Sequence, residues 1–424
     1  MLEQFVTVLP GTLAPALLVM VFSVLLGVGE GRDRPRSSSW RLIGLGVGVL
    51  GALIFALLRA TVIINRRTMV NYPTLVACVL TDLAAIVVVL AADRLVSDWH
   101  RRPWVMDLAN ALAALAIALT TFRALPDVIL QLTAFVEPGE PVLTSAMLLR
   151  ALGFLLGLAA AVTVAAILRT MHTSCPRIAF RLAALLMVVL LLVRHGVALV
   201  ALMQTTGLVL LHGWAFRVMA LGYNADLILV LAQVLVFIIP VLACLVAGWR
   251  MPVTGASTAD DRSHRAFRRR ALASAVWSLV AMIGVTLALT VGTAKAHQVP
   301  VLSPPERYSL TADTATIRFS QVEDGHLHRF SYRAKDGTEM RFIIIRKNGA
   351  AYGVGLDACD NCGDAGYYEK DGKIICKKCD VAINLATIGF KGGCNPVPLP
   401  YKTGRGAILI STADLDALSS HFKS

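Results

Sequence analysis

Charged side chains are scarce in this chain. They make up 16% of its 424 residues, whereas 56% of the residues are hydrophobic. A soluble protein of this length needs more polar surface than such a composition supplies. Several apolar runs also reach about 18 residues or more, the length needed to cross the core of a bilayer. The composition therefore excludes an ordinary soluble protein and indicates a polytopic membrane protein that carries one soluble domain.

Motifs for nucleotide binding and hydrolysis are also missing. The sequence has no GxGxxG after a strand, no Walker A pattern, no HExxH and no GxSxG. The glycine-rich run GLGVGVLG at 44–51 lies within an apolar segment, where small residues typically allow helices to pack closely. We therefore expect no nucleotide partner.

The net charge of +13 is unevenly placed. From Lys295 onward the chain has 17 basic and 14 acidic residues, so this part carries only +3. The remaining +10 lies in the membrane part, mostly in short loops. This distribution is typical of the positive-inside rule and argues against a nucleic-acid partner.

The apolar runs predict eight spans within a transmembrane domain at 1–294. Segment 203–224 is too short to cross alone, so it is either an interfacial helix or an extension of span six. A proline-containing linker at 295–307 leads to a cysteine-rich domain at 308–424. The predicted spans cover residues 8–28, 42–64, 74–92, 105–122, 144–168, 178–202, 225–248 and 271–293.

Loop charges predict the orientation. The odd-numbered loops are basic, and the fourth loop is acid-balanced through Asp127, Glu137 and Glu140, whereas Arg66 and Arg67 on the second loop disagree. The majority places both termini outside the cytoplasm, which in a bacterium is the periplasm, with the spans in the inner membrane. The basic residues of the odd loops are Arg32, Arg34, Arg36, Arg41, Arg94, Arg101, Arg102, Arg169, Arg177, Arg181, Arg250, Arg262, Arg265, Arg268, Arg269 and Arg270.

Residues 308–356 are predicted to form β-strands. TATIRFS, LHRFSYRA, TEMRFIIIRKN and AAYGVGLD alternate apolar with polar residues, and two Asp-Gly pairs and one Asn-Gly pair separate them as hairpin signals. A short strand, AILI, and a C-terminal helix with Thr412 as its N-cap close the domain.

Five of the eight cysteines lie between Asp357 and Tyr401. Two CxxC pairs are separated by 13 residues, and the fifth cysteine follows after 14 more. The first pair runs into glycine, which lets backbone N–H groups turn toward sulfur, as in a metal-binding knuckle. The pattern predicts a metal centre whose candidate ligands are Cys359, Cys362, Cys376, Cys379 and Cys394.

The cysteine pattern alone does not decide which metal binds. Disulfides are the default outside the cytoplasm, but five is an odd number and a CxxC disulfide is strained. Four cysteines in two knuckles suit structural zinc. Glycines beside the fifth cysteine favour an iron–sulfur cluster, with Cys359, Cys362, Cys376 and Cys379 preferred and Cys394 as a substitute ligand or neighbour.

The run from Phe342 through DACDNCGDAGYY, ICKKCD and TIGFKGGCNPVPL resembles the bacterial family of Fe–S-containing membrane proteins. The genes of this family often lie beside those for a periplasmic iron-binding protein and an iron permease. The resemblance covers about residues 330–401, and all five family cysteines are present. It implies an inner-membrane redox protein that serves iron uptake, with copper assistance as a variant.

Further candidates flank the cysteines. Two imidazoles in HLH, His326 and His328, and the thioether of Met340 would suit copper, although surface histidines are the simpler interpretation. Tyr367 and Tyr368 are expected to pack over the metal knuckle.

Polar residues within or close to the predicted spans mark a second candidate site. The ionisable ones cost at least about 2.5–3.5 kcal/mol each on insertion scales unless they are paired or face water. Three interpretations apply to Arg59, Arg194 and His195: they pair with Asp226, they hold a quinone or the propionate of haem b, or they line an ion path. A haem would also need His212 or His172. The polar residues are Arg59, Asp82, Arg194, His195, Asn224, Asp226 and Gln233.

The leading hypothesis is a membrane electron-transfer protein whose periplasmic iron–sulfur centre exchanges electrons with metal carried by an iron permease and a periplasmic iron- or copper-binding protein. One alternative is a zinc- or copper-binding module on a membrane scaffold or transporter. Another is a membrane thiol oxidoreductase. Cys78, Cys175 and Cys244 are expected to be small apolar residues of the spans.

Overall fold

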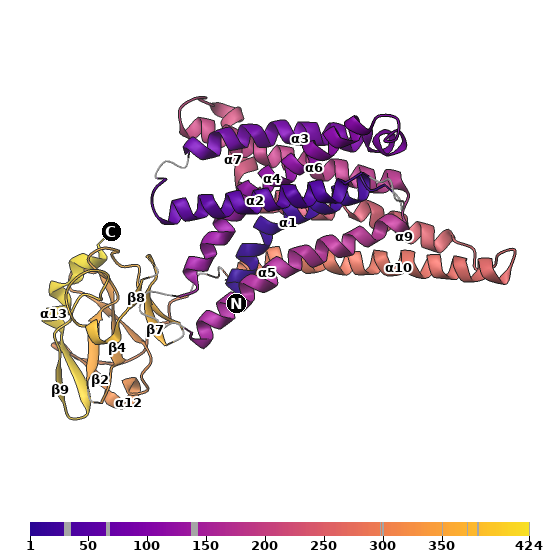
Figure 1. Ribbon diagram of the computed structural model, residues 1–424. Helices are drawn as coiled ribbons and strands as arrows, with labels where there is room; N and C mark the ends of the chain where they lie inside the picture. The colour runs from indigo at the N-terminus through magenta and orange to yellow at the C-terminus, as the bar shows by residue number, and fades with distance from the viewer. Residues whose placement is uncertain are drawn as a thin grey trace. The chain divides into compact units, whose positions relative to one another are not determined.

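The computed structural model divides into two compact units, Met1–His297 and Gln298–Ser424 (Figure 1). The structure describes residues 1–28, 35–64, 68–136, 143–296, 298, 301–349, 351–370, 372–379 and 381–423. Several charged residues of the predicted loops lie outside these described residues: Arg32, Arg34, Arg66, Arg67, Glu137 and Glu140.

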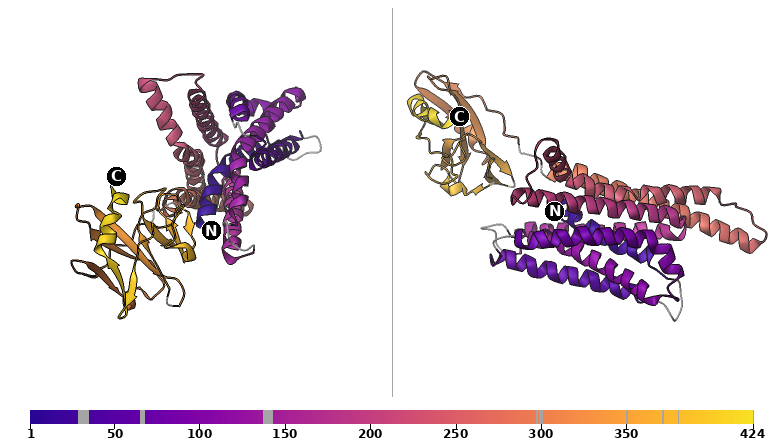
Figure 2. Two further views of the ribbon diagram at one scale, coloured as in Figure 1. Left: turned by 90° about the vertical axis from the view of Figure 1, so that its left-hand side faces the viewer. Right: turned by 90° about the horizontal axis from the view of Figure 1, so that it is seen from above.

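The first unit is helical, and the prediction of eight spans is confirmed. Eight helical stretches of the described residues are long and apolar enough to cross a membrane, and Figures 1 and 2 show their helices as long rods lying alongside one another. The seventh stretch joins two helices and the eighth ends in a π-turn and a short helix. The helices are α1 (Leu2–Leu25), α2 (Ser37–Ala60), α3 (Thr68–Ser97), α4 (Pro103–Leu130), α5 (Ser145–Thr170), α6 (Arg177–Thr205), α7 (Gly213–Asn224), α8 (Asp226–Leu235), α9 (Ile238–Arg250), α10 (Thr258–Leu287) and α11 (Thr293–Ala296).

Helix α1 is enclosed by the other helices. Its consecutive residues Leu13, Ala14 and Pro15 are all buried, as expected for a helix that is apolar on every side. Helices α2 and α4 pack closely because α2 carries glycines on the shared face. A Cβ atom on Gly48 would lie 2.6 Å from the carbonyl oxygen of Ala118. The prediction that GLGVGVLG serves helix packing is therefore confirmed.

Two helices run beyond the predicted spans. Helix α4 continues to Leu130, so Asp127 lies on a helix and not in a loop. Helix α10 begins at Thr258, where Ser257 accepts a hydrogen bond from the N–H of Asp260, so the arginines at 262–270 lie on its first turns. In both cases charged residues continue a helix that the apolar pattern alone would end.

Segment 203–224 does not extend span six, because α6 ends at Thr205 and α7 forms a separate helix with no buried residue. Helix α7 packs back onto α6, where a Cβ atom on Gly222 would lie 3.0 Å from Val197. The expectation of a short helix that does not cross the membrane agrees with this arrangement.

The second unit contains three antiparallel sheets. Their strand orders are β1-β2-β10-β9, β3-β4-β5 and β6-β7-β8. The strands are β1 (Ser309–Leu310), β2 (Thr314–Arg318), β3 (His328–Arg333), β4 (Glu339–Arg346), β5 (Tyr352–Leu356), β6 (Tyr367–Lys370), β7 (Lys373–Cys376), β8 (Ala382–Ile383), β9 (Lys402–Gly404) and β10 (Ala407–Ser411), and the helices are α12 (Phe319–Val322) and α13 (Thr412–Ala417).

Strand β4 separates two apolar cores. Phe342 and Ile344 enter the core shared with β2, β3, β5 and β10, whereas Ile343 and Ile345 enter a smaller core that contains the cysteines. This division follows from the strand periodicity, because successive side chains point to opposite faces.

The hairpin signals are confirmed at two of three positions. Asp336-Gly337 joins β3 to β4 and Asn348-Gly349 joins β4 to β5. The predicted hairpin at Asp324-Gly325 is wrong, because β2 pairs with β1 and β10 and not with β3. The N-cap of α13 is Ser411, one residue before the predicted Thr412.

Candidate metal centre

The fold gathers all five candidate cysteines of the second unit. Their sulfur atoms form two groups of three, and within each group the sulfurs lie within 4.8 Å of one another. One group contains Cys359, Cys362 and Cys376, and the other contains Cys362, Cys379 and Cys394. Cys362 therefore stands at the centre of the arrangement.

The first CxxC pair forms the expected knuckle. The N–H of Gly363 donates to the carbonyl oxygen of Cys359 at 2.9 Å, and the N–H of Cys359 returns a bond to Gly363 at 3.0 Å. Gly363 has a φ of +67°, which favours glycine. The N–H of Cys362 points at the sulfur of Cys359 at 3.2 Å, the kind of bond that stabilises a thiolate.

The sulfur spacing fits metal coordination. Tetrahedral ligands about 2.3 Å from one ion lie roughly 3.8 Å apart, which is compatible with either group of three. Two such groups that share Cys362 provide donors for two adjacent metal positions. Thiolates are the ligands of zinc and of iron–sulfur clusters, so the donor set fits both.

Burial divides the site into an inner and an outer side. Cys359 and Cys376 are buried, whereas Cys379 is exposed and its sulfur lies 3.5 Å from that of Cys394. Burial raises the pKa of the Cys376 thiol. The outer side, around Cys379, is the part of the site that a partner can reach from solvent.

Tyr367 packs against the cysteines as predicted. Its ring is buried in the same small core as Cys359 and Cys376, and its hydroxyl donates to the carbonyl oxygen of Cys394 at 2.7 Å. Burial raises the pKa of this hydroxyl, so it remains a donor. Tyr367 thereby ties the segment that carries Cys394 to β6.

A buried ion-pair network under the site was missed by sequence reasoning. Asp357 is fully buried and accepts hydrogen bonds from Nε of Arg329 at 2.7 Å and Nε of Arg341 at 3.0 Å. Its other oxygen accepts the N–H of Tyr367 at 2.8 Å. Arg329 also donates to the carbonyl oxygen of Tyr367. The only signal in the sequence was a charged residue ending an apolar strand.

The predicted copper ligands are not brought together. His328 is the first residue of β3, and its ring nitrogens face Glu306 and Asp324, each at 2.8 Å. His326 precedes the strand, so HLH does not place two imidazoles on one strand face. Met340 is buried in the larger core. His326 is exposed, as the simpler interpretation of surface histidines expects, but His328 is buried and does not fit it.

The polar residues of the spans form separate pairs. Arg59 pairs with Asp127 at 2.7 Å, and His195 pairs with Asp82 at 2.7 Å. Arg194 makes two bonds to Asp226, at 2.5 and 2.9 Å. Pairing with Asp226, predicted for all three, thus holds for Arg194 alone. Asn224 is exposed, and Gln233 is buried without a hydrogen-bond partner among the described residues.

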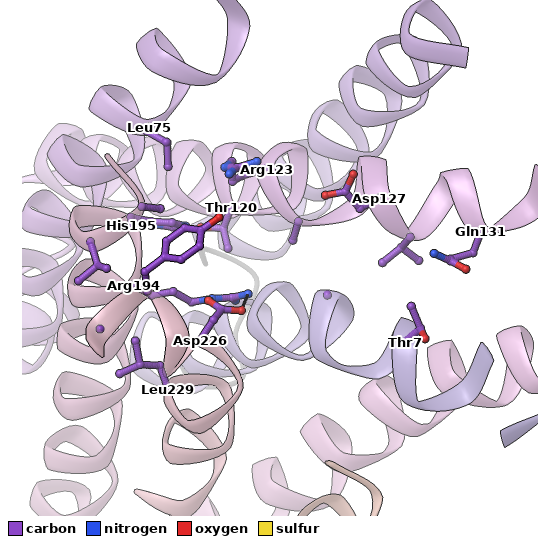
Figure 3. A pocket seen from close by; sticks show the side chains of 17 residues that line it. Thr7, Leu75, Thr120, Arg123, Asp127, Gln131, Arg194, His195, Asp226 and Leu229 are labelled. Carbon is purple, nitrogen blue, oxygen red and sulfur yellow. Dashed lines mark hydrogen bonds and ion pairs between the residues drawn. The ribbon is translucent and has the colours of Figure 1, made fainter. Parts of the chain in front are cut away.

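Several of these side chains surround a cavity of about 420 Å³ (Figure 3). Arg194 and His195 line it, together with Asp226 and Asp127, whereas Arg59 does not. Among the described lining residues His195 is the single histidine. His212 is exposed at the start of α7 and His172 follows α5, so two axial histidines for a haem are not brought together here.

The other three cysteines belong to the helical unit. Cys78 and Cys244 are buried, and Cys175 is half-buried. These positions agree with the expectation of small apolar residues.

Comparison with known proteins found a similarity for the second unit. Residues 322–422 match the family model described as "Membrane iron-sulfur containing protein FtrD-like". The match contains all five candidate ligands and confirms the resemblance read from the cysteine motifs. No curated protein and no solved structure matches the chain.

Proposed function

We propose that this membrane protein, with its FtrD-like iron–sulfur unit, is an electron-transfer component of a bacterial iron-uptake system. The observation that carries the proposal is the pair of sulfur groups sharing Cys362, within a region that matches a membrane iron–sulfur family. An iron–sulfur cluster, when bound, supplies reversible one-electron chemistry.

The five cysteines of the unit have different proposed roles. Buried Cys359 and Cys376 hold the inner side of the centre, and exposed Cys379 with Cys394 forms the side at which electrons pass to or from a partner. Cys362 belongs to both groups. Hydrogen bonds from backbone N–H groups, such as that of Cys362 to Cys359, favour the thiolate form.

The proposed location is the inner membrane, with the cysteine unit in the periplasm. The arginines of odd-numbered loops, including those on the first turns of α10, support this orientation. An iron permease and a periplasmic iron- or copper-binding protein are the proposed partners. Copper assistance would come from such a partner, because His326, His328 and Met340 do not form a site.

The test is metal analysis of the full-length protein, purified without oxygen in mild detergent. We expect iron and acid-labile sulfide in equal amounts and visible absorption that is bleached by dithionite. Cys376→Ser should lose most of the absorption, and Cys244→Ser, in the membrane unit, should retain it. A colourless protein with one zinc per chain would exclude electron transfer by the cysteine centre.

Zinc is the second candidate, because either group of three sulfurs also suits one tetrahedral ion with one further ligand. It would make the unit a structural module on a membrane scaffold. A thiol oxidoreductase is distinguished by alkylation. Metal-free protein with reactive Cys379 and Cys394 and disulfide reductase activity would favour that function over both metal centres.

A further inference from the structure

The cavity in the helical unit is lined by residues of six helices and of the turn after α4. The helices are α1, α3, α4, α6, α7 and α8, and α3 contributes Leu75. Figure 3 shows Arg123 and Asp127 from α4, Arg194 and His195 from α6, and Asp226 at the start of α8 around one opening. A volume of about 420 Å³ falls in the range of small-molecule sites.

Arg123 is the unusual member of this lining. It lies inside α4, two turns before the helix ends, yet no described residue forms an ion pair or hydrogen bond with it. The other two arginines nearby, Arg59 and Arg194, have carboxylate partners. An unpartnered guanidinium within a span is costly, and a ligand that accepts its hydrogen bonds offsets the cost.

His195 supplies a second polar contact. It is 5% exposed and lines the cavity, and its Nδ1 is held by Asp82, which is 1% exposed. This leaves Nε2 for a ligand. A histidine oriented by a buried carboxylate accepts a proton from a hydroxyl group through Nε2 and, once protonated, donates to a carbonyl oxygen.

The charges of the cavity favour a neutral headgroup. Asp127 and Asp226 line it as well as Arg123 and Arg194, so an anion such as a lipid phosphate would meet two carboxylates. A neutral headgroup with oxygen atoms satisfies Arg123 and His195 without that repulsion.

An apolar cleft continues from the cavity. A second pocket of about 400 Å³ shares Leu75, Arg123, Ala198 and Tyr223 with it. This pocket adds Leu202, Phe216 and Met219 from α6 and α7. An apolar tail can lie in this cleft along α6 and α7. The cleft therefore favours a ligand with an apolar tail over a small ion.

We propose that this cavity binds the headgroup of a quinone or hydroquinone. Arg123 donates a hydrogen bond to one ring oxygen. His195, held by Asp82, forms a hydrogen bond with the other ring oxygen, and the isoprenoid tail lies in the cleft beside α7. The inference rests on the proposed function, because a quinone would be the lipid-soluble carrier that exchanges electrons with this electron-transfer protein. Binding itself needs no reaction at the cysteines, so the two proposals can fail separately.

The experiment measures retention of decylubiquinone and of a short-chain menaquinone by quinone-depleted, full-length protein in dodecyl maltoside, using equilibrium dialysis. We expect saturable binding near one quinone per chain. Arg123→Gln should weaken it at least tenfold. Arg217→Gln is the matched control, because Arg217 is exposed on α7 and does not line the cavity.

A second variant addresses folding. Ala198→Phe fills the space between the cavity and the cleft with an apolar side chain and should also abolish binding, while the melting temperature of each variant reports its stability. The proposal would be overturned if the wild type bound no quinone. It would also be overturned if Arg123→Gln and Ala198→Phe both bound quinone as strongly as the wild type. Retention of phosphatidylglycerol with no quinone bound would assign Arg123 to a lipid phosphate and would also overturn it.

Discussion

Asp357 has no solvent exposure and collects two guanidinium groups and one backbone N–H beneath the cysteines. Asp357→Asn leaves the buried Arg329 without its counter-charge, so we predict a loss of about 3–5 kcal/mol in the free energy of unfolding of the second unit. Pulse proteolysis of the full-length protein in urea measures this quantity.

The control for this substitution is Asp364→Asn. Asp364 is exposed, and it is the backbone oxygen of this residue that accepts a bond from Arg341. Its substitution should change stability by less than about 0.5 kcal/mol. Equal effects of the two substitutions would show that the buried network does not stabilise the site.

His328 is expected to make stability depend on pH. Burial alone would lower its pKa, but the carboxylates of Asp324 and Glu306 at its two ring nitrogens raise the pKa above the ordinary value. The stabilisation is therefore complete below the ordinary pKa of about 6.5 and is lost as pH rises through the higher folded value.

The measurement is the free energy of unfolding of the second unit between pH 5 and pH 9. We predict that His328→Gln lowers it by about 1–2 kcal/mol at pH 5.5 and flattens its decline with pH. His326→Gln should have a smaller effect, because the His326 side chain is 69% exposed and its pair with Glu369 is screened by water. A decline that persists in His328→Gln would assign the pH dependence to another group.

At the scale of elements, the contact of α2 with α4 depends on glycine. Gly48→Val would place a Cβ within 2.6 Å of the Ala118 oxygen and of Thr121, so the helices must separate. We predict a loss of about 1–3 kcal/mol, seen as a lower melting temperature in detergent.

Gly46 provides the control, because a Cβ atom there meets nothing within 4 Å. Gly46→Val adds the same side chain to the same helix and should leave the melting temperature nearly unchanged. If both variants melt alike, close packing at Gly48 does not stabilise the bundle.

The helices and strands were largely predictable from the sequence, but the pairing of the strands was not. Apolar length gave the eight spans, and alternation gave β2, β3, β4 and β5, because these periodicities are local. The pairing of β2 with β10 joins residues far apart in the sequence, and no local pattern reports it. Arg123 was missed because the apolar run predicted a span that ended at residue 122.

For the metal site, the sequence predicted the candidate ligands but not their arrangement in space. CxxC spacing identified the five cysteines, because a knuckle is a local turn. The two sulfur groups and the buried network of Asp357 depend on how β4, β5 and β6 meet, which spacing does not encode. His195 was recognised as costly in a membrane, but its partner Asp82 lies 113 residues earlier in the chain.

At the scale of the whole molecule, the proposed orientation makes a prediction. Alkaline phosphatase fused after Ser424 should be active, and green fluorescent protein fused there through the general secretion route should be dark, because the C-terminus would be periplasmic. A fusion that ends at Thr254, between α9 and α10, should give the opposite pair of results. An inactive phosphatase at Ser424 would place the cysteine unit in the cytoplasm.

Strand β4 has a consequence for how the second unit survives in the cell. Since its alternate side chains serve both cores, displacement of β4 would expose apolar side chains of both. A metal bound only by the folded unit would then stabilise every strand by mass action. Chains that fail to acquire metal would open more often and meet proteases first, so metal supply would set how many copies persist.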